Sequence, residues 1–267
     1  MAREGPTAVV TTRGRASRSL ILALQVAFFV VTVGTWEIAA REGWLDPFFF
    51  SKPSAIGARI AEWIGTGYIW PHLFTTLVEA MAAFVIGIAS GVTAGLVLAR
   101  VDLLAAVFDP YIRVLNALPR VILAPILIIL FGLGMESKIA LGVTLVFFVV
   151  FFNTFQGVRE VNPVILNNAR MLQASNRQLM RHVYLPSAMA WIFSSLHTSI
   201  GFALVGAVVG EYIGSAKGIG YVVSQAQGVF DTTGVFAGLI LTSIVVLGID
   251  LAIERLEHYL LRWRPQA

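Results

Sequence analysis

The sequence contains five apolar runs that are long enough, or nearly long enough, to cross a membrane. A transmembrane helix needs about 20 apolar residues, and lipid offers backbone polar groups no partners, so such runs fold as helices. The shortest of the five can be extended at both ends. The sequence therefore predicts an all-α membrane protein with clear spans at Leu20–Ala40, Leu73–Ala99, Ile139–Phe155, Ala188–Ile213 and Phe236–Leu256.

A sixth span is marked less sharply. Val121–Met135 is apolar but short, and Arg120 stands on its cytosolic flank. We expect Pro110–Leu118 to form a helix at the inner interface that leads into a span interrupted by Pro119 and Pro125. The predicted organisation is a cytosolic tail at 1–18, a first span at 19–40, an extracytoplasmic segment at 41–72, a transmembrane core at 73–260 that includes a cytosolic loop at 158–187, and a cytosolic tail at 261–267.

Composition and charge support a membrane location. Hydrophobic residues make up 57% of the chain and charged residues 13%, unlike an average soluble domain. Lys and Arg gather on the cytoplasmic side of membrane proteins, and six spans with the N-terminus inside place most of the 19 Lys and Arg residues there. We therefore predict that both termini are cytosolic and that the first apolar run is a retained helix, not a cleaved signal peptide.

The polar loop at 158–187 carries four Arg and separates two spans. Asn162–Pro163 has the pattern of an N-cap followed by Pro at the first helical position. Ser175–Gln178 has capping-box spacing. An apolar ridge follows it, formed by Leu179, Met180 and Val183. The loop is predicted to form two short helices that meet at a bend, and helices this short need a partner surface.

Small residues recur at four-residue spacing in two spans. The first stripe is Gly87, Gly91 and Gly95, and the second is Gly206, Gly210 and Gly214. Such stripes let helices approach closely, either as plain bundle packing or as a sliding interface along a pathway. Charges inside spans are few, and each costs a few kcal/mol. We expect Glu211, near the outer end of its span, to hold an extracytoplasmic gate, with Gly206, Gly210, Gly214, Pro119 and Pro125 as further candidates for the translocation path.

Several other functions are disfavoured. The basic residues form no stripe with interleaved aromatics, so no nucleic acid is expected, and the four His lack the spacing of metal ligands. There is no GxxxxGK[ST] loop for ATP hydrolysis and no paired nucleophile and base. A secondary carrier or channel stays open as the alternative, although the deep charges and inverted repeats expected of a carrier are missing.

The polar loop resembles the EAA loop of binding-protein-dependent ABC importer permeases. The closing Leu-Pro and the hydrophobic position of that motif are present, and its Glu and Gly are replaced. The positions that correspond to the motif are Asn167, Asn168, Ala169, Gln173, Val183, Leu185 and Pro186. Phe131–Gly134 resembles the family's WFGxG turn, Gly210–Tyr221 its AE-x-x-G-x-x-x-GLGY segment, and Ser51–Ser54 its PSP element.

The resemblance is closest to permeases of nitrate, sulfonate, taurine and pyrimidine-precursor importers. It implies a type I bundle of six transmembrane helices with a cytosolic coupling helix, in the bacterial inner membrane. It further implies a permease homodimer, two cytosolic ATP-binding subunits that hold ATP and Mg, and an extracytoplasmic solute-binding protein, with no cofactor on this chain. The expected function is the passage of a small anionic or polar solute, of the sulfonate, nitrate or taurine type, by alternating access.

The same resemblance implies which residues contact the ATPase. They are the seven motif positions together with Ala174, Ser175, Leu179 and Met180. Because Gln173 adopts a positive φ less easily than the Gly of the motif, we expect Ala174–Asn176 to carry the bend of the loop.

Overall fold

The computed structural model describes residues 18–260, and all regular secondary structure in that range is helical. The predicted tails at 1–18 and 261–267 fall outside this range except for Arg18, which begins α1. The chain forms two compact units, one ending at Ala55 and the other beginning at Ile56. Five helices are long and apolar enough to cross a membrane, and a bent helix pair makes a sixth span, so the predicted all-α, six-span architecture is confirmed.

The first unit holds the first span and the start of the segment that follows it. α1 covers Arg18–Arg41 and α2 covers Pro47–Phe50, where the Asp46 side chain caps α2 by accepting a hydrogen bond from the Phe48 amide at 2.9 Å. Near the end of α1, the Glu37 carboxylate accepts hydrogen bonds from the amide and the hydroxyl of Ser54 at 2.9 and 2.8 Å. These contacts fix the PSP-like element against the end of the first span.

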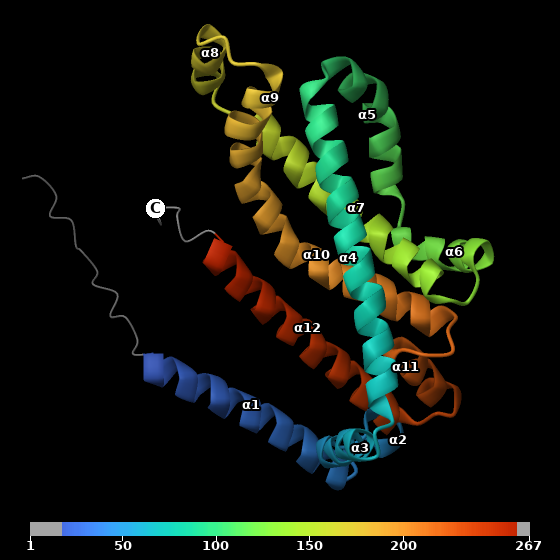
Figure 1. Ribbon diagram of the computed structural model, residues 1–267. Helices are drawn as coiled ribbons and strands as arrows, with labels where there is room; N and C mark the ends of the chain where they lie inside the picture. The colour runs from blue at the N-terminus through green and yellow to red at the C-terminus, as the bar shows by residue number, and fades with distance from the viewer. Residues whose placement is uncertain (1–17, 261–267) are drawn as a thin grey trace, which may run out of the picture. The chain divides into compact units, whose positions relative to one another are not determined.

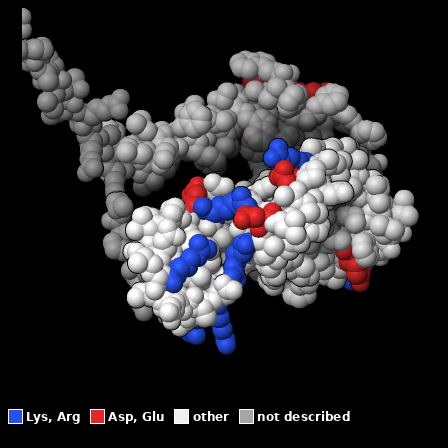
Figure 2. All heavy atoms as spheres, turned by 90° about the horizontal axis from the view of Figure 1, so that it is seen from above, with Lys and Arg blue, Asp and Glu red and all other residues white. Residues whose placement is uncertain are grey.

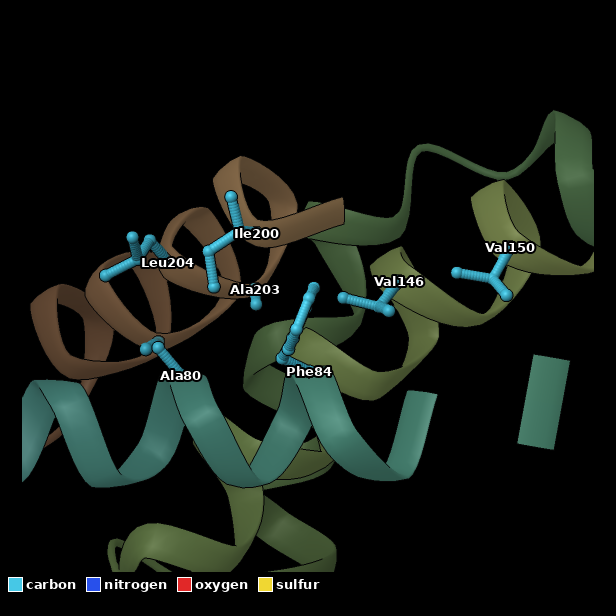
Figure 3. Close-up of a cluster of buried hydrophobic side chains, with 8 residues drawn as sticks. Ala80, Phe84, Val146, Val150, Ile200, Ala203 and Leu204 are labelled. Atoms are coloured by element: carbon cyan, nitrogen blue, oxygen red, sulfur yellow. The ribbon is translucent and has the colours of Figure 1, made fainter. Parts of the chain in front are cut away.

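The second unit begins within α3 (Pro53–Gly65) and is built on three long helices that pack together (Figure 1). They are α4 (Ile69–Arg100), α7 (Met135–Arg159) and α10 (Leu185–Ile213), and α12 (Thr232–Leu260) packs beside α10. Figure 3 shows their shared apolar core. Its buried side chains are Ala80, Phe84, Val146, Val150, Ile200, Ala203, Leu204 and Ala207. The apolar faces of the spans thus bury one another, and their outer faces stay exposed.

The first glycine stripe, and Gly206 and Gly210 of the second, lie in contacts between these helices. A Cβ added to Gly87 would meet the Val146 side chain at 2.6 Å, and one on Gly95 would meet Thr154 at 2.8 Å. Gly206 lies directly against the backbone of Gly142 on α7. The stripes therefore bring α4 and α10 close to α7, which is what bundle packing requires of small residues in lipid.

The third span differs from its prediction. α5 starts at Asp102 and runs to Ala117, a 3-10 turn η1 covers Arg120–Leu123, and α6 covers Ala124–Phe131. The two helical parts meet at an angle of 85°. The predicted helix at 110–118 is thus only the second half of α5. The predicted span at 121–135 is only the second part of a broken span that begins with α5.

The proline positions explain this break. Leu118 precedes Pro119 and adopts an extended ψ of 131°, because a residue before proline is pushed out of the helical region. Pro125 lies in the first turn of α6, where its missing amide costs nothing. Pro110 lies inside α5 and does not end it.

Candidate functional sites

The polar loop forms two short helices, as predicted. α8 covers Pro163–Met171 and carries Asn167, Asn168 and Ala169. The Asn162 side chain accepts a hydrogen bond from the Val164 amide at 2.9 Å, which confirms the predicted N-cap. α9 covers Asn176–Leu179, and Ser175 forms both hydrogen bonds of a capping box with Gln178. Local sequence signals alone are enough to place both helix starts.

Gln173 carries the bend between the two helices, with φ of +58°. Its amide donates to the Arg170 carbonyl at 2.9 Å, and the Ala174 amide donates to the Ala169 carbonyl at 3.1 Å. This pair of bonds is the Schellman pattern that usually places Gly at the left-handed position. The expectation that Ala174–Asn176 would carry the bend is therefore wrong. The last carbonyls of α8 accept both amide hydrogen bonds only if Gln173 adopts the left-handed conformation that the Gly of the motif would have.

The loop does not close at Leu185–Pro186. α9 continues through a π-helical turn η2 (Met180–Tyr184) directly into α10, so that Asn176–Ile213 is one continuous helix. Pro186 lies in the first turn of α10. A proline lacks an amide donor and clashes with the carbonyl four residues earlier, and the wider π turn relieves both problems.

The predicted apolar ridge is not exposed. Leu179 is 5% exposed, Val183 is also buried, and both pack with Val161 at the end of α7. Met180 is half-buried. These side chains hold the loop against the bundle, and Leu179 and Val183 also line a cavity of about 340 Å³ beside the loop. Their contact with a partner subunit stays a prediction. A helix this short gains most of its stability from such packing.

Other apolar side chains of the loop are open to a partner. Leu172 is 83% exposed, and Met171, Val164 and Ile165 are also exposed on α8 and its end. Beside them lies a cavity of about 340 Å³ lined partly by Leu172, Gln173 and Gln178. Figure 2 views the molecule from this end and shows several Lys and Arg side chains on it. The exposed arginines there are Arg100, Arg159, Arg170, Arg177 and Arg181.

At the opposite end of α10, Glu211 is the centre of a buried polar cluster. Its side chain is only 1% exposed. One carboxylate oxygen accepts a hydrogen bond from the Thr76 hydroxyl at 2.7 Å, and the other accepts one from the Gly220 amide at 2.7 Å. The Thr76 oxygen in turn accepts a hydrogen bond from the Ile219 amide at 2.9 Å. Glu211 and Thr76 thus tie the start of α11 (Ile219–Gly228) to α4 and α10.

Two glycines at the start of α11 allow this approach. Gly218 has a φ of +106°, and a Cβ on it would overlap the Glu211 carboxyl group. A Cβ on Gly220 would collide with the Val208 carbonyl. The Gly-Ile-Gly element at 218–220 is therefore required by the carboxylate it surrounds, because a residue with a side chain would push the backbone away from Glu211.

Two more ionisable groups complete the cluster, and the sequence did not indicate either role. Lys138 is fully buried, and its ammonium donates to the Leu133 and Gly134 carbonyls at 2.7 and 3.0 Å. Glu79 is buried beside Glu211, within hydrogen-bonding reach of it. Burial of two carboxyl groups and one ammonium in one place reduces the cost that a lone charge would have there.

The remaining pathway candidates surround this cluster or the break in the third span. A Cβ on Gly210 would meet the Lys138 side chain at 2.9 Å, and one on Gly214 would meet Ile128 and Leu133 at 3.1 Å. Pro119 and Pro125 flank the 3-10 turn of the broken span. No group of three or more His, Cys, Asp or Glu suited to a metal ion occurs within residues 18–260.

Comparison with known proteins identifies the class of protein. Residues 87–262 match the family described as "Binding-protein-dependent transport system inner membrane component". SsuC of Bacillus subtilis (strain 168), whose name describes an aliphatic sulfonates transport permease protein, is 31% identical over 88% of this chain and 85% of its own. The formylaminopyrimidine transport permease protein ThiX of Halalkalibacterium halodurans is 30% identical over 90% of this chain and 95% of its own.

The fold matches solved structures as well. A chain in the crystal structure of an amino acid ABC transporter with histidines superposes with a TM-score of 0.60, at 20% identity, over 76% of this chain and 96% of that chain. This protein therefore belongs to the binding-protein-dependent transport system inner membrane components. It is a multi-pass permease of the ABC importer class, and the resemblance seen in the polar loop is confirmed.

Proposed function

We propose that this permease passes a small anionic or polar solute, of the sulfonate or taurine type, by alternating access. The observation that carries this most directly is the family match together with relatives that cover nearly the whole chain, among them an aliphatic sulfonate permease. A rigid-body switch of a packed bundle fits the fold, since close glycine contacts join α4, α7 and α10 into one body.

We propose that ATP and Mg are held by two separate cytosolic subunits that contact the 158–187 loop. Support comes from the shape of this loop, which has capped helices, a fixed bend at Gln173, and an apolar surface around Leu172 that the chain leaves exposed. Asn167 and Asn168 lie on the same exposed helix. In this proposal the buried Leu179 and Val183 keep the loop rigid enough to transmit a movement to α10.

The orientation follows from the same end of the bundle. The exposed arginines there support a cytosolic location of this end, and we propose that both termini lie on the same side, as an even number of spans requires. The Glu211 cluster would face the outside, where a solute-binding protein docks, and we propose that it gates the path because it holds the turn before α11 in place. A second copy of this chain would complete the path as a homodimer.

Reconstitution tests this proposal. The permease and its cognate ATPase are placed in proteoliposomes, with the matching binding protein and taurine or ethanesulfonate outside. We expect uptake that needs MgATP and the binding protein together. Uptake that proceeds down or against an ion gradient without ATP would contradict the proposal and favour a secondary carrier.

A further inference from the structure

Arg120 lies beside the middle of α7, not at the cytosolic flank where the sequence suggested it. Its guanidinium carbon is 4.4 Å from the centre of the Phe148 ring on α7, which is a cation–π contact. α7 runs from Met135 to Arg159. At 1.5 Å per residue this helix is about 37 Å long, and Phe148 lies about 16 Å from its Arg159 end. The positive charge therefore lies near the middle of the spans.

This charge has no acidic partner. Arg113 and Arg159, the neighbouring arginines of α5 and α7, are paired with Asp109 at 2.8 Å and with Asp102 at 3.0 Å. No ion pair of Arg120 is found in the described part of the chain. Its Nε is buried without a hydrogen-bond partner. A cation at this depth is costly, and no acidic side chain that the structure describes pairs with it to offset the cost.

Capping of α5 is the simpler role for this side chain. The Arg120 Nη2 donates to the Asn116 side chain and, at 3.4 Å, to the Asn116 carbonyl. This contact closes the last turn of α5 at the break. However, a guanidinium has five N–H donors, and a bond to a neutral amide leaves its charge in place. Capping alone does not explain a buried Nε with nothing to bind.

The side of α7 below Arg120 is not suited to lipid. Phe148, Phe152 and Phe155 follow one another at helical spacing, and the Phe148 and Phe152 rings are 6.3 Å apart. Phe152 and Phe155 border a cavity of about 390 Å³ between α4, α5, α7 and α10, and its polar side chains are Asp109, Asn153 and Gln156. The Asp109 carboxylate there is paired with Arg113. Amide groups and a guanidinium on one side of a membrane bundle indicate water or protein, not lipid.

We propose that Arg120 contacts the negative charge of the transported solute, and that the solute is an anion with a sulfonate, carboxylate or similar oxyanion group. This inference rests on the proposed permease function and specifies its substrate class. The guanidinium offers paired N–H donors that match the geometry of such a group. The Phe148–Phe155 stripe then gives the apolar part of the solute a surface that leads toward the polar loop.

Introduced thiols test the proposal without knowledge of the solute, because the chain contains no cysteine. Phe152→Cys places a thiol one helical turn from Phe148 at an exposed position. The full-length variant in lipid nanodiscs is treated with methanethiosulfonate reagents that carry either a sulfonate or a trimethylammonium group. At about 10 Å and an effective dielectric constant of about 40, one positive charge should make the anionic reagent react about tenfold faster than the cationic one. The reference is the reagent ratio at Asn167→Cys in a chain that also carries Arg170→Gln, because Arg170 is one helical turn from Asn167 on α8.

Removal of the charge should abolish this preference. Arg120→Gln in the Phe152→Cys chain should return the ratio to that of the reference, and Arg120→Lys should keep most of it. Arg170→Gln, which removes an exposed charge from α8, should leave the ratio unchanged. If the Arg120→Gln variant does not reach the membrane, the proposal is tested by the reagent ratio at Phe152→Cys with Arg120 intact, compared with the reference ratio.

Three outcomes would overturn the proposal. They are a ratio at Phe152→Cys equal to the reference, a preference that survives Arg120→Gln, and a thiol that reacts with neither reagent because it faces lipid. None of these measurements uses ATP. A failure of ATP-driven uptake would therefore refute the permease function separately from the role of Arg120.

Discussion

Loss of the Thr76 hydroxyl should loosen the turn that precedes α11. This hydroxyl donates to Glu211 at 2.7 Å and accepts from the Ile219 amide at 2.9 Å, and Thr76 is fully buried. Thr76→Val keeps the shape of the side chain but leaves a buried amide without an acceptor and a carboxylate oxygen with one donor fewer. At about 1–2 kcal/mol for each group, the local opening of α11 should become easier by about 2–4 kcal/mol.

Amide hydrogen exchange followed by mass spectrometry measures that opening. For the peptide that covers Ile219–Gly228, 2–4 kcal/mol corresponds to exchange that is about 30- to 700-fold faster. Thr75→Val is the matched control, since Thr75 is the adjacent residue and its hydroxyl bonds only to the Pro71 carbonyl of its own helix. Equal exchange of this peptide in the two variants would refute the reasoning, because the Thr76 hydroxyl would then hold nothing in place.

Three other predictions concern helix packing, the loop and the gate. Gly206→Ala would push a methyl group into the backbone of Gly142 and should destabilise the permease by about 1–3 kcal/mol in thermal melts. Gly201→Ala, which has open space around it, should not. Equal melting temperatures of the two variants would contradict the packing role. Gln173→Gly should remove the strain of the positive φ and stabilise the loop by up to about 1 kcal/mol. Amide hydrogen exchange in the 158–187 loop should then become slower, and faster exchange would contradict this prediction. Glu211→Gln should lower ATP-driven uptake at equal membrane abundance, because an amide cannot accept both hydrogen bonds; unchanged uptake would reduce Glu211 to a structural role.

Features set by local sequence could be predicted. Five spans follow from apolar length, and the caps at Asn162 and Ser175 follow from the competition of short polar side chains for free backbone amides. The family resemblance could be found because the motif of the loop is itself a local pattern. Glu211 could be selected because a carboxylate inside an apolar helix next to a Gly-rich turn needs donors nearby.

Features set by packing between distant helices could not be predicted. Lys138 looks like a loop charge in Glu136-Ser137-Lys138, and only the approach of α10 at Gly210 shows that it is buried. Leu179 looks like an exposed ridge until the end of α7 covers it. Arg120 looks like a flanking charge because the sequence does not show that α5 starts at Asp102 and meets the next helical segment, which begins at Arg120, at an angle of 85°.

Site-specific photo-cross-linking tests most directly whether the end of the bundle that carries the polar loop is the cytosolic ATPase contact. The permease is co-expressed with its ATPase and labelled with a benzophenone maleimide. The probe is attached to Leu172→Cys at the exposed end of α8 or, as the control, to Ser215→Cys in the turn after α10. We expect the probe at 172 to cross-link to the ATPase, with a yield that changes on addition of ATP, and the probe at 215 to give no such product. A cross-link to the ATPase from 215 and none from 172 would contradict both the orientation and the coupling role of the loop.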